Sequence, residues 1–587
     1  MALKASIIAI AASAQLLLAN ATEQLHWSLS PLKGSPEKSD AKDPWIKNAI
    51  DSFVLAKLKE NNLKPQPEAD RYTLMRRLHA GLTGILPSTE EINAFINNAS
   101  SNAYTELVDD LLTDAHYGER WARHWLDVAR FGESNGTLTV NEDRIRNDAW
   151  KYRDAVINAF NNDLPFDLFV KYQLNPRSDK ISSDYKELRQ FIHLGTKLQN
   201  NANPNDRQFH RLNDMVSTTG SAFLGFSFGC ARCHDHPVDP MSTEEYYQFT
   251  ALFFDQFSEN PKASTKKIPL KITEPKILIK GDWKSPGKSV SPGFLKILMQ
   301  KPVDHWLDGN GNKMEALGSW IIDPINGSGS LLARVIVNRL WHHHFGQGLV
   351  STPNDFGKIG SKPTHPELLD WLSAELIKNN WQLMPIQKLI VTSATYTQKN
   401  SSSPEYLTRD SDNTLLWHRK PQRLEAEIIR DRLLDVAGVL KKQMYGKSTP
   451  VGDYKKALPD SSNSWRRSIY LQSHRSVHHP TLSLFNYPDT SASVGSRSTS
   501  TGESSTLFSL NSKFLWTLSK HFAERIKKES TEDPKDRIEK AYMIALSRPP
   551  NEQEITIGMN IINGQDDAKL INFCHLIFGL NEFIYIH

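Results

Sequence analysis

The pentapeptide Cys230-Ala231-Arg232-Cys233-His234 constrains the fold of this chain more than any other feature. Two thiols separated by two residues and followed directly by an imidazole have the spacing that attaches a c-type haem. Both sulfurs can form thioethers with the haem vinyl groups, and the histidine can bind the iron. The motif therefore predicts covalent haem c, with Cys230 and Cys233 as tethers and His234 as the axial metal ligand.

Two other uses of a Cys-x-x-Cys pair stay open at this point, a disulfide and a metal site. A structural zinc site usually needs a second ligand pair, and the only other thiol of the chain is Cys574. The residues after the motif are candidate neighbours of a haem. We expect Asp235 or Asp239 to orient imidazole N–H groups, and we interpret His236 as a supporting or substrate-contacting group, or as an ordinary turn histidine.

The N-terminal residues predict export. Residues 1–21 contain one lysine, an apolar run from Ala5 to Leu18 and small residues at Ala19 and Ala21, which is the pattern of a secretory signal peptide. The apolar run is too short and too polar to span a bilayer comfortably, and no later segment is apolar enough. We therefore expect a periplasmic protein without stable membrane insertion, whose three cysteines do not hold the fold together.

Charge and length limit the classes of function and the number of domains. The 70 basic and 66 acidic residues give a net charge of +4, so we expect no nucleic-acid partner. A chain of 587 residues has room for about two to four domains. We expect a mainly α fold with a signal peptide at 1–21, a helical, cytochrome c-like domain at 22–258, a small β-rich insert or linker at 259–310 and a mainly helical C-terminal domain at 311–587.

Apolar periodicity carries this expectation of helices and short strands. Helices are predicted at 45–61, 70–78, 88–96, 103–112, 117–130, 149–161, 214–228, 243–254, 331–345, 365–378, 385–392, 423–441, 508–528, 534–545 and 567–583. Strands are predicted at 267–273, 276–280 and 467–471. Ser88 and Glu91 have the spacing of a capping box, and Gly346 is a natural helix stop.

The predicted helix 117–130 mixes large aromatic residues with Arg and Asp. Its spacing permits ion pairs between Glu119 and Arg123 and between Asp127 and Arg130. A buried aromatic core with surface ion pairs explains this composition, and so does the wall of a haem or substrate pocket. Both interpretations place the segment near the haem if the first domain is a single unit.

A second cluster lies on one short predicted helix, and its members are Arg334, Asn338, Arg339, Trp341, His342, His343 and His344. Three consecutive histidines point around a helix, so they do not form a His-x3-His metal site. One interpretation is a mixed interface helix. The sharper one is that His343 is the distal haem ligand or a general base, because a neutral imidazole suits both tasks.

The order of these motifs resembles a two-domain family of planctomycetes and related bacteria, a planctomycete-type cytochrome c domain followed by its usual C-terminal companion domain. The first domain is similar at residues 26–27, 51–58, 82–84, 117–130, 150–154, 230–236 and 239–240, and the second at 333–341, 343, 345–346, 423–427, 467–471 and 548–550. The resemblance covers nearly all of the chain after the expected signal peptide. It favours His343 among the three histidines.

The chain departs from the family pattern in two places. Many relatives carry an additional N-terminal cytochrome c domain, which is not expected here. Ser504-Ser505 stands before Leu507 where Pro-Gln is usual, so the function of that loop stays open.

The resemblance implies haem-dependent oxidation of sugars, because genes of the family resemble those found beside sulfatases and glycosidases. We expect a periplasmic haem c oxidoreductase that dehydrogenates a carbohydrate or related alcohol and passes electrons to a soluble cytochrome or another acceptor. His343 would abstract a proton, while Arg334, Arg339, Asp127 and Arg130 would position substrate hydroxyls. The competing interpretation is a non-catalytic haem c electron carrier or a polysaccharide-binding module.

Overall fold

A computed structural model describes residues 25–33, 43–136, 143–175, 181–198, 202–257, 270–308, 312–453, 456–498, 508, 510–562 and 566–587. The expected signal peptide lies outside these ranges, and so do residues 267–269 of the first expected strand. Within the described ranges, no helix has both the length and the apolar character needed to cross a bilayer.

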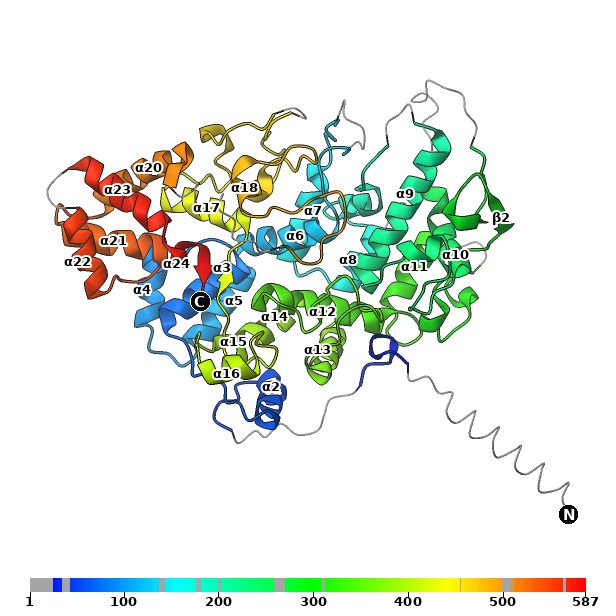
Figure 1. Cartoon of the computed structure of the whole chain (residues 1–587), viewed down its shortest axis with the longest axis horizontal. Helices are drawn as coiled ribbons and strands as arrows, with labels where there is room; N and C mark the ends of the chain where they lie inside the picture. Colours follow the sequence, from blue (N-terminus) through cyan, green and yellow to red (C-terminus); the bar gives the residue numbers. More distant parts are fainter. Residues whose placement is uncertain are drawn as a thin grey trace, which may run out of the picture.

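The described chain is mainly helical, as predicted (Figure 1). The helices before the strands are α2 (Ala49–Glu60), α3 (Arg71–Leu82), α4 (Thr89–Asn97), α5 (Ala103–Thr113), α6 (Ala115–Val128), α7 (Trp150–Asn161), α8 (Phe166–Leu174), α9 (Pro204–Thr219) and α10 (Thr243–Phe253). Those after them are α11 (Lys313–Ile322), α12 (Gly329–Phe345), α13 (Pro366–Lys378), α14 (Leu383–Thr392), α15 (Ala394–Thr397), α16 (Pro404–Arg409), α17 (Ala426–Val436), α18 (Pro480–Leu484), α20 (Lys513–Glu529), α21 (Pro534–Leu546), α22 (Glu552–Ile561), α23 (Asp567–Phe578) and α24 (Asn581–Ile584).

Shorter helical turns connect these helices. They are η1 (Trp27–Leu29), η2 (Lys186–His193), the π-helical turn η3 (Gly220–Leu224), η4 (Gly229–Arg232), η5 (Phe254–Gln256), η6 (Ile279–Gly281), η7 (Lys296–Leu298), η8 (Val303–His305), η9 (Ser462–Ser464) and η10 (Ser468–Tyr470). The predicted capping box is confirmed, because the Ser88 hydroxyl accepts from Glu91 N–H and the Glu91 carboxylate accepts from Ser88 N–H.

A small antiparallel sheet of β1 (Lys276–Leu278) and β2 (Pro286–Ser289) lies between the two helical segments, as expected. A second pair, β3 (Gln422–Arg423) and β4 (Tyr585–Ile586), joins the last described residues to the segment before α17. Arg423 was expected to begin a helix. It lies in β3 instead, and α17 starts three residues later.

The strand predicted at 467–471 is wrong. Ser468–Tyr470 form the 3-10 turn η10, and Leu471 alone of this segment forms an isolated bridge, to Thr449. The cause is Asp431 in α17, whose carboxylate accepts hydrogen bonds from the backbone N–H of Ser468 at 2.7 Å and from its hydroxyl at 2.6 Å. A local pattern cannot reveal a partner that lies 37 residues away.

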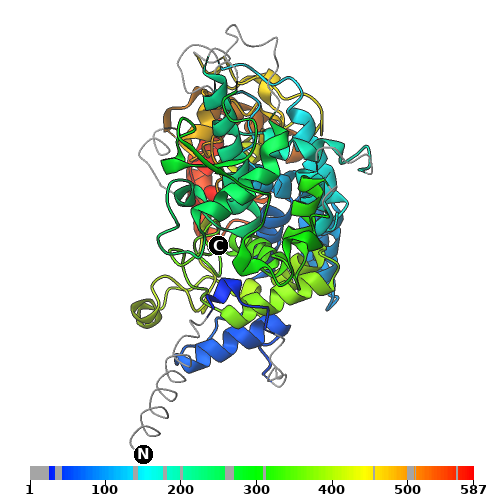
Figure 2. The same ribbon diagram turned by 90° about the vertical axis from the view of Figure 1, so that its right-hand side faces the viewer.

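One large hydrophobic core extends through both helical segments. It contains buried side chains of α6 to α10 and of α11 to α14, and the burial of this apolar surface is the main force that holds the segments together. α8 contacts α11, and α12 contacts α11, α13, α14 and η3. The cyan and green segments accordingly lie side by side in both ribbon views (Figure 1, Figure 2). A second core joins α17 to α20, α21 and α23.

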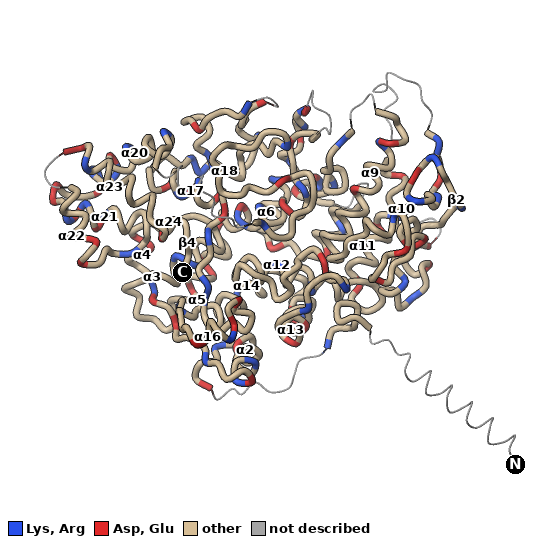
Figure 3. The backbone as a smooth tube through the Cα atoms, viewed as in Figure 1, with Lys and Arg blue, Asp and Glu red and all other residues tan. Residues whose placement is uncertain are grey.

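Charged residues are distributed over all parts of the described chain. Lys and Arg are interspersed with Asp and Glu along the backbone (Figure 3). The charges that matter for a site are therefore those that are buried, because exposed pairs in water contribute little.

Candidate functional site

The Cys-x-x-Cys-His motif lies at the surface, between η3 and α10. Cys230 and Cys233 are exposed, and neither forms a disulfide with the other or with the buried Cys574. The Tyr247 hydroxyl of α10 donates to the backbone carbonyl that precedes Cys233, at 3.0 Å, and lies 3.3 Å from the carbonyl of Leu278. α10 and the β1–β2 element therefore hold the backbone of the motif, while both thiols stay accessible.

The donor atoms of the motif fit a covalently bound haem c. His234 is exposed, and its Nδ1 lies 2.7 Å from the carbonyl oxygen of Asp235. A contact of this kind fixes one ring nitrogen and leaves Nε2 as a metal ligand. Two free thiols at tethering spacing, followed by such an imidazole, are the donors that haem attachment needs.

Asp235 and His236, two of the expected haem neighbours, support the loop after the motif. The Asp235 carboxylate accepts from the backbone N–H of Thr243 at 2.7 Å, at the start of α10. His236 is buried, and its Nδ1 accepts from the backbone N–H of Asp239 at 2.9 Å. Both side chains thus accept hydrogen bonds from backbone N–H groups of the chain.

A cavity of about 450 Å³ begins directly before the motif, at Phe228 and Gly229. Asp214 of α9 and residues 491–493 form other parts of its wall. Arg130 pairs with Asp214 at 2.6 Å and donates to two backbone carbonyls. Arg130 therefore supports the wall of this cavity.

A second, larger cleft of about 480 Å³ lies where α6, the end of α12 and the start of α17 meet. Its described lining includes six cationic side chains and two carboxylates, namely Arg77, Arg120, Arg419, Lys420, Arg423 and Arg497 with Asp127 and Glu425. Four histidines complete the polar wall, namely His124, His342, His343 and His344. The cations outnumber the carboxylates, so the described lining of the cleft has a net positive charge even when these histidines are neutral.

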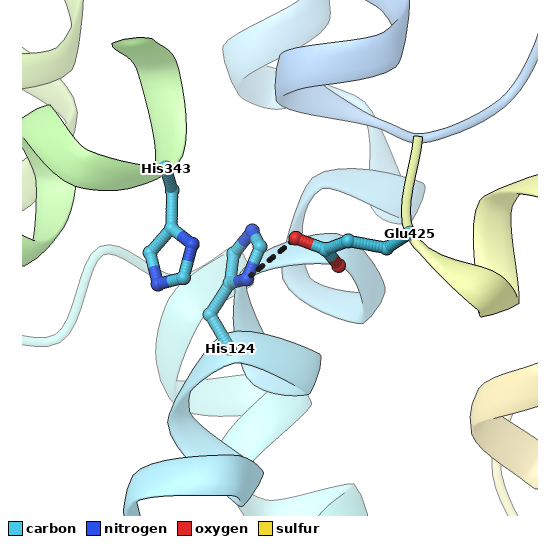
Figure 4. Close-up of side chains that lie close together, drawn as sticks. All are labelled: His124, His343 and Glu425. Atoms are coloured by element: carbon cyan, nitrogen blue, oxygen red, sulfur yellow. Dashed lines mark ion pairs between the residues drawn. The ribbon is translucent and has the colours of Figure 1, made fainter. Parts of the chain in front are cut away.

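Three elements bring the central side chains together (Figure 4). His124 comes from α6, which is buried from Tyr117 to Val128. His343 lies in the last turn of α12, which ends as predicted at Gly346, with φ +79°. The two imidazole rings stack with centroids 3.5 Å apart and an angle of 22° between their planes. Glu425 precedes the first residue of α17, and its carboxylate lies 3.6 Å from Nδ1 of His124.

Burial keeps these imidazoles neutral at neutral pH. Desolvation lowers the pKa of His124 and of His343 well below 6.5, and it lowers the pKa of His342 to about 4 and of His344 to about 3. For Glu425, burial alone would raise the pKa. The guanidinium groups of Arg120 and Arg497 outweigh burial and hold that pKa well below its usual range.

Two ion pairs expected within α6 are wrong. The charged side chains of α6 are buried, so they bind partners from other elements as well as from their own helix. The pairs that form instead include Glu119 with Arg467, Arg123 with Asp127, and Arg130 with Asp214. The interpretation of these charges as surface ion pairs is therefore also wrong.

Arg497 joins the carboxylates of the cleft, and the sequence did not single it out. Its Nε donates to Asp127 at 2.6 Å and its Nη1 to Glu427 at 2.6 Å, and Nη1 lies 3.7 Å from Glu425. His124 and Glu425 were also missed as site residues. The available signals were a histidine within the aromatic segment and two glutamates at 425 and 427.

Comparison with family models matches two regions of the chain. Residues 49–258 match PSCyt2, described as a protein of unknown function (DUF1549), and residues 314–562 match PSD1, described as a protein of unknown function (DUF1553). Together they form the planctomycete cytochrome c-type two-domain architecture. The chain belongs to this PSCyt2–PSD1 family. No curated protein and no solved structure matches it.

Both matched regions of the PSCyt2–PSD1 protein contribute to the cleft. His124 and Asp127 lie in the PSCyt2 region, and His343, Glu425 and Arg497 lie in the PSD1 region. Neither region alone supplies the full set of side chains.

Two of the expected substrate-positioning arginines do not line the cleft. Arg334 pairs with Asp370 at 2.8 Å, and it donates to the carbonyl of Ser30 at 2.7 Å. Arg339 donates to the carbonyls of Ser221, at 2.7 Å, and Ala222 in η3. Both side chains hold the PSD1 helix α12 in place.

Of the residues expected to act in catalysis, the cleft contains His343 and Asp127. His234 is not part of its described lining. The role of His343 as a distal haem ligand opposite His234 therefore stays a prediction.

One loop forms a shared wall between the two cavities of the PSCyt2–PSD1 protein. Residues 491–493 line the cavity beside the motif, and residues 494–497 line the cleft. Asn354 holds this loop, because its side chain donates to the Ser493 hydroxyl at 3.2 Å and accepts from Arg339 at 3.0 Å. The cavity that begins beside the motif and the cleft thus share one short, anchored segment in their walls.

Proposed function

We propose that this PSCyt2–PSD1 protein is a periplasmic oxidoreductase that carries haem c on Cys230 and Cys233 and oxidises an acidic carbohydrate bound in the cleft. The observation that carries the proposal is the pair of exposed, unpaired thiols followed by His234 with one free ring nitrogen. Bound haem c would supply a one-electron redox couple, through which a soluble cytochrome or another acceptor would take the electrons one at a time.

The charge of the cleft supports an acidic substrate. Arg419 packs against the rings of both Phe345 and Tyr396, with its guanidinium carbon 4.8 and 4.9 Å from the ring centroids. It donates to the carbonyl of His344, and its buried Nη1 has no hydrogen-bond partner among the described residues. Burial lowers its pKa to about 9, so it is still a cation at neutral pH. A carboxylate or sulfate group of a substrate would satisfy it.

His343 is the proposed base. Oxidation of a hydroxyl-bearing carbon to a carbonyl breaks one O–H and one C–H bond and releases two electrons and two protons. A neutral imidazole at the cleft wall can accept the hydroxyl proton, the proton of the C–H bond would pass to water, and the two electrons would leave in two one-electron transfers through the haem to the external acceptor. Asp127 is held by Arg123 and Arg497, so it fixes Arg497, which lines the cleft. Arg130, Arg334 and Arg339 have a supporting role. Arg130 holds the wall of the cavity beside the motif, and the other two hold α12.

Optical spectroscopy tests this proposal. The full chain is exported together with haem-attachment machinery, the visible spectrum is recorded, and the oxidised protein is mixed with acidic sugars, neutral sugars and simple alcohols. We expect a Soret band that the double variant Cys230→Ser/Cys233→Ser lacks, and faster reduction by acidic than by neutral sugars. The absence of a Soret band would overturn the haem assignment. A haem that no sugar, alcohol or aldehyde reduces would leave a carrier or a binding module.

A further inference from the structure

We infer that His124, His343 and Glu425 bind a divalent first-row transition metal ion in the cleft. One nitrogen of each imidazole and one carboxylate oxygen all lie within 4.8 Å of one another. Across the described ranges of the chain, no other group of three or more His, Cys, Asp and Glu residues brings its donor atoms so close. The inference does not rest on the haem motif, whose residues are not part of the described lining of the cleft.

The imidazole of His124 lacks a hydrogen-bond partner among the residues that the structure describes. Both of its ring nitrogens are buried and have no hydrogen bond to any described residue. The carboxylate of Glu425, at 3.6 Å from Nδ1, is beyond hydrogen-bonding distance. Buried polar atoms nearly always have a partner. A metal ion on one of these nitrogens would supply it.

Arg120 orients the carboxylate ligand. Its Nη1 donates to Oε2 of Glu425 at 2.6 Å, and Arg497 lies 3.7 Å from the same oxygen. Oε1 is the oxygen that faces His124. A hydrogen-bonded partner behind a ligand is the usual arrangement at metal sites, because it fixes the direction of the ligand. The two nearby cations also moderate the affinity for a metal ion through repulsion.

The three side chains can reach one ion after a small movement. Figure 4 shows the His343 and His124 rings facing each other, with Glu425 on the far side of His124. Bonds of about 2.1 Å in tetrahedral geometry place donor atoms roughly 3.3 Å apart. The most widely separated pair, within 4.8 Å here, must therefore approach by roughly 1.5 Å. Trp121 packs edge-on against both rings, which limits their rotation.

The donor set indicates the class of metal. Two neutral imidazoles and one carboxylate suit Zn²⁺, Fe²⁺, Co²⁺ and Mn²⁺ better than Ca²⁺ or Mg²⁺, which prefer oxygen ligands. Three protein ligands leave coordination positions open, as at catalytic metal sites. These positions face a cleft of about 480 Å³, where a water molecule or a substrate oxygen would complete the coordination.

Metal binding and base catalysis are alternatives for His343. A ring nitrogen that binds a metal ion has no lone pair for a proton. A metal-loaded cleft would therefore remove the base role from the ligating nitrogen of His343 without affecting the haem motif. A direct measurement of metal binding distinguishes the two roles.

Cobalt titration tests the inference, because Co²⁺ bound by imidazole and carboxylate absorbs visible light. Full-length protein is stripped with a chelator, and Co²⁺ is added to the wild type and to the variants His124→Ala, His343→Ala and Glu425→Gln. We expect one Co²⁺ per chain in the wild type. Each ligand variant should weaken binding by about 100-fold or more, since the loss of even an outer-shell partner costs about 10- to 100-fold.

Two matched controls make the result specific. His342→Ala removes the neighbouring imidazole of the same cleft, and Cys230→Ser/Cys233→Ser removes the exposed thiols, so both should bind Co²⁺ as the wild type does. Circular dichroism and thermal unfolding confirm that each variant is folded, and the nearly isosteric Glu425→Gln guards against misfolding. A wild type that takes up no Co²⁺ overturns the inference. Uptake that survives the ligand variants and disappears with the thiols also overturns it, because the metal then binds the motif.

Discussion

At the scale of the residue, Arg419 is the cation that most directly predicts how the cleft recognises its ligand. Two aromatic rings and one backbone carbonyl hold it, and no described carboxylate pairs with it. A buried cation without a counter-charge is unfavourable in the empty cleft, because desolvation is not repaid by an ion pair. An acidic ligand would supply the missing charge.

Replacement of Arg419 should weaken binding of the ligand without lowering the stability of the fold. Arg419→Gln should weaken binding of an acidic sugar by about 10-fold or more, since hydrogen bonds to charged groups contribute about 1.5–3 kcal/mol. The midpoint of thermal unfolding should stay the same or rise, because an unpaired buried charge is removed. The measurements are the sugar concentration dependence of haem reduction and calorimetry. Lys420→Gln, next along the cleft wall, is the control with a smaller effect on binding. Equal binding in Arg419→Gln and the wild type would contradict the role of Arg419.

Single residues could be predicted where the chemistry is local. The spacing of Cys230, Cys233 and His234, and the helix stop at Gly346, are visible in a few consecutive letters. His343 was singled out for its residue type. Its partners could not be found, because His124 and Glu425 lie 219 residues before it and 82 residues after it. Only the packing of α6, α12 and α17 brings these side chains together.

At the scale of the element, the π-helical turn η3 sets the path of the chain from α9 to the motif. It ends at Gly225, whose φ of +60° lies in the left-handed region. A Cβ at this position would lie 2.9 Å from Phe356 and 3.0 Å from Val335, both in the PSD1 region. The turn therefore needs glycine for its backbone and for its close approach to α12.

A pair of glycine variants tests this requirement. Gly446→Ala meets the same φ penalty, because Gly446 has a φ of +83°, but no atom lies within 4 Å of the added Cβ. We expect Gly446→Ala to lower the free energy of unfolding by about 1 kcal/mol and Gly225→Ala by about 3 kcal/mol, since overpacking adds to the backbone cost. Urea denaturation measures both. Equal losses would mean that η3 and α12 are not tightly packed.

Elements with strong periodicity were predicted well, and those held by distant partners were not. The helices α6, α12 and α23 follow from apolar residues at helical spacing. The turn η10 was mistaken for a strand because Asp431 of α17 fixes it, and β3 was mistaken for helix because its partner β4 lies more than 160 residues away. The arrangement of the two matched regions around one cleft could not be predicted from either region.

At the scale of the whole molecule, Arg467 links the PSCyt2 and PSD1 regions through buried charges. It pairs with Glu119 of α6 and with Asp431 of α17, and it donates to the carbonyl of Thr83 at 3.0 Å. Its removal would leave two buried carboxylates without their main counter-charge.

Arg467→Met should lower the free energy of unfolding by about 3–5 kcal/mol, the usual cost of breaking a buried ion pair from one side. Chemical denaturation measures the loss. The control is Lys378→Met, which removes a pair with Glu375 from a lysine whose side chain is 74% exposed and should cost less than about 1 kcal/mol. Similar losses in the two variants would show that the two regions do not depend on this contact.

Acid should destabilise the molecule at mildly low pH. Burial lowers the pKa of His79 and His342 to about 4 and of His344 and His365 to about 3. In the unfolded chain these imidazoles bind protons near pH 6.5, whereas in the folded protein they bind protons only at lower pH. The free energy of unfolding is therefore highest above pH 6.5 and decreases as the pH falls toward 4. The unfolding midpoint should be nearly constant from pH 8 to 7 and fall steadily below 6.5. A midpoint that stays constant down to pH 5 would contradict the buried, neutral state of these imidazoles.

The intact mass of the exported chain shows most directly whether haem is attached to Cys230 and Cys233. The protein is produced with haem-attachment machinery, beside a known c-type cytochrome as a positive control, and its mass is compared with that of Cys230→Ser/Cys233→Ser. The wild type should be heavier than its polypeptide by one haem, carried on the peptide that contains Cys230 and Cys233, and the double variant should not. A wild type with the mass of the bare polypeptide, while the control cytochrome is fully loaded, would show that Cys230 and Cys233 do not carry haem.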